Sequence, residues 1–88
     1  MQFEGAVIKE QGITFAIVIV KPHVLNNQTE AQNAISSFRI FFPGMPIILM
    51  AQDSFGRPTY LGRTDIVRFL SGISLSRIPW QRYTASYS

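Results

Sequence analysis

The sequence contains no cysteine and only one histidine, His23, among its 88 residues. Without cysteine the chain has no disulfide, no zinc–thiolate site, no iron–sulfur cluster and no thiol chemistry. A single histidine likewise excludes every metal site that is built from several histidines. We therefore expect this protein to use neither a metal nor a cofactor.

Charged residues and long apolar runs are scarce as well. Only 15% of the residues are charged and 47% are hydrophobic, a composition that excludes disorder over most of the length. The longest apolar run, residues 15–20, is far shorter than the ~20 residues that span a bilayer, and residues 1–4 do not resemble a secretion signal. We therefore expect a cytoplasmic protein that has no membrane partner.

The charge that is present is unevenly distributed. Residues 1–53 hold three cations and four carboxylates, whereas residues 54–88 hold five arginines and one carboxylate. Six aromatic side chains also lie in residues 54–88. Because a guanidinium binds carboxylate or phosphate through paired hydrogen bonds and stacks on aromatic rings, this asymmetry is the main indication of function in the sequence.

Two runs, residues 13–20 and 46–51, are apolar at both alternating positions. A strand with one wet face would alternate, so these runs indicate inner strands that are covered on both faces. Between them, Asn27 and Glu30 form a variant of the helix capping box, and apolar residues then recur at helical spacing up to Phe42. Strand, crossover helix and strand together predict a right-handed parallel unit.

Shorter elements are expected on either side of this unit. Residues 3–8 are typical of a first strand, and residues 59–61 of a short antiparallel strand at a sheet edge. Thr64 is in position to cap a last helix, which Gly72 ends.

The resulting order ββαββα predicts a single α/β domain, or an α+β domain, over residues 1–75. We expect a mixed four-stranded sheet with two helices, one on each face. If both helices shared one face, the bare face would favour a homodimer; we favour the monomer. Residues 76–88 form an arginine- and aromatic-rich tail that is either packed back on the domain or flexible.

Three features follow one another in a recognisable order: a strand that starts with proline, two turn glycines and the start of a last helix. They lie at Met45-Pro46-Ile47, at Gly56 and Gly62, and at Thr64-Asp65-Ile66. In this respect residues 13–73 resemble a shortened thioredoxin-like fold. The redox cysteines of that family would fall where this chain has Pro22-His23-Val24-Leu25, and the family's intervening helix and strand are missing. The resemblance implies the fold and a cis peptide bond before Pro46, and it excludes dithiol chemistry.

Lys21 and His23 follow the first predicted inner strand, at the sheet edge where ligands bind in open α/β folds. A histidine there is able to serve as a general base or a hydrogen-bond donor. The sequence shows no nucleophile near it, and a lone histidine at such a junction is usually structural. We predict Lys21 and His23 as ligand contacts, and an enzyme that uses His23 is the third interpretation of function.

The tail interleaves arginine with aromatic residues. This combination is typical of an interface with an acidic protein and also of single-stranded nucleic-acid binding, unless the rings fold back and the arginines are merely solvated. We predict a small non-enzymatic protein-interaction module with an acidic protein partner, and a nucleic-acid-binding module is the alternative. The predicted contact residues within 54–88 are Arg57, Arg63, Arg77, Trp80, Arg82 and Tyr83.

Overall fold

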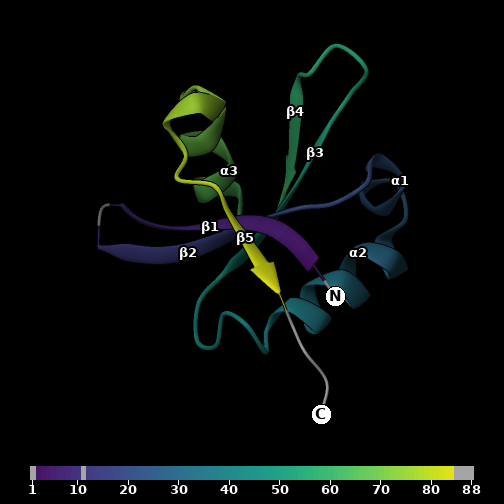
Figure 1. Ribbon diagram of the computed structural model, residues 1–88, viewed down its shortest axis with the longest axis horizontal. Helices are drawn as coiled ribbons and strands as arrows, with labels where there is room; N and C mark the ends of the chain where they lie inside the picture. The colour runs from purple at the N-terminus through teal and green to yellow at the C-terminus, as the bar shows by residue number, and fades with distance from the viewer. Residues whose placement is uncertain (1, 11, 85–88) are drawn as a thin grey trace.

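The computed structural model describes residues 2–10 and 12–84, and a five-stranded mixed sheet lies at its centre. The strands lie side by side in the order β4-β3-β2-β1-β5. Figure 1 shows how the elements follow one another: β1 (Gln2–Glu10), β2 (Ile13–Ile19), α1 (Pro22–Leu25), α2 (Gln28–Phe38), β3 (Ile47–Gln52), β4 (Pro58–Leu61), α3 (Thr64–Ser71), the 3-10 turn η1 (Leu75–Arg77) and β5 (Gln81–Thr84).

β2 and β3 form the centre of the sheet. They pair in parallel, with Ile17 opposite Ile48, and each has another strand on its outer side. The side chains of Ile17 and Ile48 are 0% exposed, because both faces of this strand pair are covered. The prediction of two adjacent parallel inner strands, drawn from residues 13–20 and 46–51, is confirmed, and α2 is the crossover between them.

α2 and α3 lie on opposite faces of the sheet (Figure 1). Phe38 of α2 shares one cluster of buried side chains with Leu49 of β3. Leu70 of α3 shares a second cluster with Ile48, the residue before Leu49 in the same strand. Because successive strand residues point to opposite faces, the two helices cover different faces. The predicted arrangement with one helix on each face is therefore confirmed, and the alternative with both helices on one face is wrong.

The ends of the helices agree only in part with the prediction. The Asn27 side chain accepts a hydrogen bond from the backbone N–H of Glu30 at 3.0 Å, so the predicted cap of α2 is confirmed. α2 ends at Phe38 rather than at Phe42, which is buried in the turn that follows. The predicted cap of α3 is wrong: Thr64 is already the first helical residue, and no side chain caps the preceding position.

The prediction of four strands and two helices is incomplete, because it lacks α1 and β5. β5 pairs antiparallel with β1, with Tyr83 opposite Phe3, and Ile78 just before it is 4% exposed in the cluster under α3. The described part of the predicted tail, residues 76–84, thus packs onto the domain. Residues 85–88 of that tail lie outside the described residues.

The cis peptide bond that the thioredoxin-like resemblance implies is absent. Every peptide bond in the described residues is trans, including the bond before Pro46. The Pro46 carbonyl accepts a hydrogen bond from the Ala16 N–H at 2.9 Å, so the trans backbone leads directly into the pairing of β2 with β3. Within the same described ranges, no helix has the length and apolar character needed to cross a membrane.

Candidate functional site

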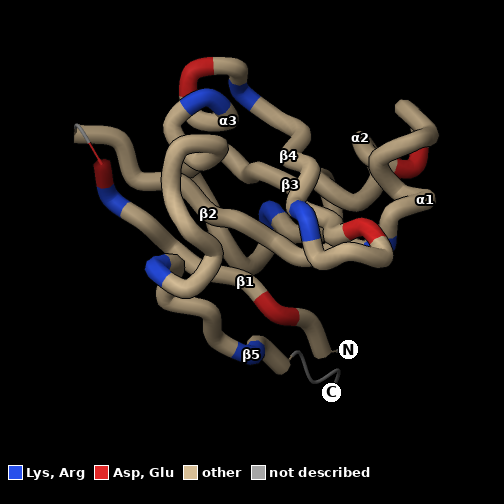
Figure 2. Tube along the Cα trace, turned by 90° about the horizontal axis from the view of Figure 1, so that it is seen from above, with Lys and Arg blue, Asp and Glu red and all other residues tan. Residues whose placement is uncertain are grey.

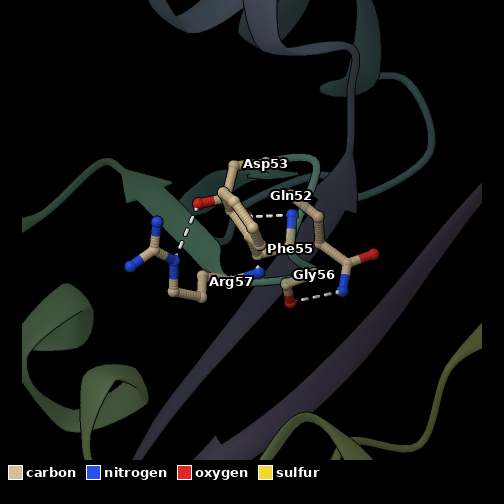
Figure 3. Close-up of polar contacts among 5 residues, drawn as sticks. All are labelled: Gln52, Asp53, Phe55, Gly56 and Arg57. Carbon is tan, nitrogen blue, oxygen red and sulfur yellow. Dashed lines mark hydrogen bonds and ion pairs between the residues drawn. The ribbon is translucent and has the colours of Figure 1, made fainter.

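The turn between β3 and β4 is braced by a network of hydrogen bonds (Figure 3). Asp53 Oδ1 accepts from the backbone N–H groups of Phe55 and Arg57 at 2.8 and 3.0 Å, and Asp53 Oδ2 accepts from Arg57 Nε at 2.9 Å. Gln52 Nε2 donates to the Gly56 carbonyl at 3.0 Å, and Gly56 has a φ of 79°. Aspartate at the first and glycine at the fourth position are typical of such a turn, and these hydrogen bonds hold its conformation.

Phe55 lies on this turn with almost no protein around its ring. The residue is 81% exposed, and the loop that carries it projects from the body of the molecule (Figure 1). Arg57 places its guanidinium carbon 5.2 Å from the ring centroid, a cation–π arrangement. The turn therefore presents an aromatic ring and an arginine together to solvent.

The charge of Asp53 is part of the brace. Its pKa lies below its ordinary value, chiefly because the backbone N–H of Arg57 donates to the carboxylate; the N–H of Phe55 and the Arg57 side chain act in the same direction. Hydrogen bonds to the ionised form favour it over the protonated form. The carboxylate is thus ionised at neutral pH, where it holds both backbone N–H groups.

Arg63 is occupied by an ion pair with a neighbouring carboxylate. Its Nε and Nη2 donate to the two carboxylate oxygens of Asp65 at 3.0 and 2.7 Å. This pair lowers the pKa of Asp65 and raises the pKa of Arg63, in both cases mainly through the side-chain hydrogen bond. The bidentate contact thus forms across the start of α3.

The three predicted contact residues near β5 make contacts within the domain. Trp80 Nε1 donates to the Leu75 carbonyl at 3.1 Å, and the indole is partly buried against the cluster under α3. Tyr83 stacks on Phe3 at a centroid distance of 5.1 Å. Arg82 remains 67% exposed, with Nη2 at 3.6 Å from Oε1 of Glu4 in β1.

These residues do not form one continuous surface. Arg57 flanks β4 and Arg82 lies in β5, and these strands are the two opposite edges of the sheet. Trp80 and Tyr83 belong to clusters on opposite faces. Figure 2 shows the basic positions spread around the chain rather than gathered on one side. A contact surface within residues 54–88 can therefore include only some of these predicted residues.

Arg77 lines a cleft that the sequence did not reveal. The cleft has a volume of about 510 Å³ and lies between the end of β1, the end of α3 and the segment before β5. Lys9 shares its rim with Arg77, and Phe69 and Ile73 contribute apolar side chains. Lys9 and Phe69 lie far apart in the sequence, and no local pattern shows that they line one cleft.

Lys21 and His23 lie near the carboxyl end of β2, as expected. The small hollow at this edge, of about 100 Å³, is lined by neighbours such as Pro22 and Leu25. His23 Nδ1 lies 2.9 Å from Oε2 of Glu30, and both side chains are well exposed. Within the described part of the chain, no three metal-ligating side chains gather. The His23–Glu30 pair links α1 to α2.

Comparisons with known proteins leave the geometry as the basis for any functional assignment. No family model matches this chain, and no curated protein or solved structure is significantly similar to it. The resemblance of residues 13–73 to a thioredoxin-like fold thus stays a prediction.

Proposed function

We propose that this chain is a small protein-interaction module whose β3–β4 turn inserts Phe55 into an apolar pocket of a partner protein. The observation that carries the proposal is a phenylalanine that is 81% exposed on a braced turn. Burial of such a side chain contributes about 1.5–3 kcal/mol of favourable free energy. Because Phe55 stays exposed in the folded chain, this free energy does not contribute to folding. It would contribute to binding if the ring entered an apolar pocket of a partner.

The brace lowers the cost of binding. A loop that becomes ordered only on contact spends part of the interaction energy on lost conformational freedom. Here the carboxylate of Asp53 already holds the Phe55 and Arg57 backbone in place. The backbone that carries the ring is therefore already ordered when the ring meets a partner, and aromatic residues are frequent at the centre of interfaces.

Arg57 supports an acidic partner. It donates Nε to Asp53, and among the described residues its two Nη groups make no hydrogen bond within the chain. Its side chain is 75% exposed. A carboxylate beside the partner pocket would pair with these Nη groups while Phe55 enters the pocket. Phosphate binding relies on several cations that neutralise neighbouring phosphates, and the basic positions of this chain are spread around it rather than gathered at this turn (Figure 2), which favours a protein partner over a nucleic acid.

The test is affinity capture from the native cell with the immobilised chain, followed by titration with each captured protein after purification. We expect Phe55→Ala to weaken the interaction at least tenfold and to leave the circular dichroism spectrum unchanged. Ile40→Ala is the matched control, because Ile40 is a similarly exposed apolar residue at 82%, and it should bind like the unchanged chain.

Two results would overturn the proposal. In the first, Phe55→Ala binds every captured protein as tightly as Ile40→Ala does. In the second, capture is abolished by nuclease and falls steeply with salt, as phosphate contacts do. The second result would establish the nucleic-acid-binding alternative instead.

A further inference from the structure

β5 covers only part of the outer edge of β1. Its four residues pair with Gln2 to Gly5, while β1 continues as far as Glu10. On its other side β1 is paired with β2 along residues 5–10. The outer edge of residues 6–10 therefore has no strand beside it in the described structure.

The register identifies which backbone groups point to this open edge. Glu10 pairs with Ile13 across a gap of two residues, so these two residues exchange hydrogen bonds. In an antiparallel ladder such pairs alternate, so Ile8 also points its N–H and C=O groups toward β2. The N–H and C=O groups of Val7 and Lys9 consequently point outward, and within the described residues no other backbone group bonds to them.

Pro79 explains why the chain does not fill the edge itself. Gly5 pairs with Gln81, so an extension of β5 toward its start would place Pro79 opposite Val7 and Arg77 opposite Lys9. Pro79 has no N–H to donate to Val7. The segment instead turns away, with the Trp80 N–H bonded to the Ile78 carbonyl at 2.8 Å.

The space left beside this edge is the cleft of about 510 Å³. Its floor includes Phe69 and Ile73 from the end of α3 and the segment that follows it, and Val7, 40% exposed, lies at its side. A volume of this size accommodates one or two side chains of an extended peptide. Unpaired strand groups next to an apolar cleft are the two elements of peptide recognition by strand addition.

We propose that an extended acidic segment of a partner protein adds to the sheet along residues 7–9 of β1, in line with β5. Its backbone bonds to Val7 and Lys9, one apolar side chain enters the cleft against Phe69 and Ile73, and acidic side chains pair with Lys9 and Arg77. This site lies at the opposite edge of the sheet from the β4 side, so it is a second interaction surface that does not depend on Phe55.

Charge argues for an acidic peptide rather than a second copy of this chain. Lys9 and Arg77 line the cleft with a single carboxylate, Glu10, and neither cation has an ion-pair partner among the described residues. Pairing of β1 with β1 of another copy would bring Lys9 and Arg77 of both chains together. A lysine on an edge strand opposes this kind of self-association.

The probe is a pool of labelled decapeptides in which fixed glutamates alternate with positions randomised among valine, isoleucine, leucine and phenylalanine. We expect binding by fluorescence anisotropy, with changed NMR shifts and slower hydrogen exchange at the Val7 and Lys9 amides. Arg77→Glu should weaken binding at least tenfold. Arg68→Glu is the matched control, because it changes the net charge equally on an exposed face of α3 and should weaken binding less than threefold.

A second peptide pool, N-methylated at alternate positions in either phase, tests the backbone contacts directly. Because N-methylation removes the donors that strand addition needs, we expect a loss of at least tenfold in one phase. Equal binding in both phases, unchanged Val7 and Lys9 amides, or no binding from the pool would each overturn the proposal. A concentration-dependent dimer through the same amides would also overturn it. Phe55→Ala should leave peptide binding unchanged. A failure of the strand-addition proposal can therefore be distinguished from a failure of the proposal for the β3–β4 turn.

Discussion

The ring of Tyr83 lies flat on the ring of Phe3, with centroids 5.1 Å apart and planes inclined by 11°. Phe3 is 9% exposed in the cluster under α2, and Phe42 meets Tyr83 edge-on at 5.2 Å. Through these contacts Tyr83 fastens the last strand to the first. A residue that the sequence suggested as a partner contact thus has a packing role on this side of the sheet.

Tyr83→Ala should lower the free energy of unfolding by about 2–3 kcal/mol, toward the lower end for aromatic truncations because the ring is only partly buried. Tyr83→Phe keeps the stacking and should cost less than about 1 kcal/mol. Urea unfolding followed by circular dichroism measures both changes. Arg82→Ala, next in the strand and exposed, should cost at most about 1 kcal/mol. A Tyr83→Ala chain as stable as Arg82→Ala would contradict the packing role.

Trp80 is the only tryptophan in the chain, so fluorescence reports directly on its surroundings. Its Nε1 bonds to the Leu75 carbonyl at 3.1 Å, and the indole packs near α3. Trp80→Phe should cost about 1 kcal/mol for the lost hydrogen bond, and Trp80→Ala about 2–4 kcal/mol. The emission of the folded protein should lie to the blue of the urea-unfolded chain. Emission at the unfolded wavelength would show that the indole is free in solution.

The central part of the fold was predictable because its cause is local in the sequence. Residues 13–20 and 46–51 are apolar at both alternating positions, with Thr14 the one polar residue among them, and only a site covered on both faces accommodates such strands. β5 escaped prediction because a single one of its four residues, Tyr83, faces the core, while its neighbours are exposed. One inward side chain gives no detectable alternation in the sequence. The strand conformation of β5 depends mainly on its backbone pairing with β1.

The candidate surfaces were predictable to a smaller extent. The Asp53 turn follows a local sequence pattern, because aspartate and glycine occupy its first and fourth positions. The exposure of Phe55 depends instead on how far the hairpin of β3 and β4 projects. The cleft exists because β5 starts at Gln81 and Pro79, just before it, turns away from the edge of β1 beside Val7. Val7 and Pro79 come from opposite ends of the chain. No local pattern encodes a relationship between such distant segments.

Gly5→Ala should destabilise the sheet by about 1–3 kcal/mol, as overpacked positions do. A Cβ at this position would lie 2.6 Å from the backbone oxygen of Ile17 in β2, and a backbone atom held in a strand yields less readily than a flexible side chain. Gly72→Ala is the matched control, because its Cβ would meet only an ordinary contact at 3.6 Å. Thermal unfolding should place Gly5→Ala several degrees below Gly72→Ala. Equal midpoints would contradict the close approach.

The braced turn should loosen in acid. Because the pKa of Asp53 is lower in the folded chain than in an unfolded one, chiefly through the Arg57 backbone N–H, its contribution is complete above the unfolded value of about 4. That contribution is lost as the pH falls through the lower folded pKa. Carbon-detected NMR should give a titration midpoint for Asp53 below that of an unstructured aspartate.

Asp53→Asn should reproduce the acid effect at neutral pH, because an uncharged amide holds the two N–H groups less strongly. Hydrogen exchange at the Phe55 and Arg57 amides should then become several-fold faster. Asp65→Asn is the control, because it removes another carboxylate whose pKa is lowered and Asp65 is not part of this turn. If Phe55 acts through a preorganised ring, Asp53→Asn should also weaken partner binding while Asp65→Asn does not. Unchanged exchange in Asp53→Asn would show that the turn holds its shape without the carboxylate, and the preorganisation argument for Phe55 would fail.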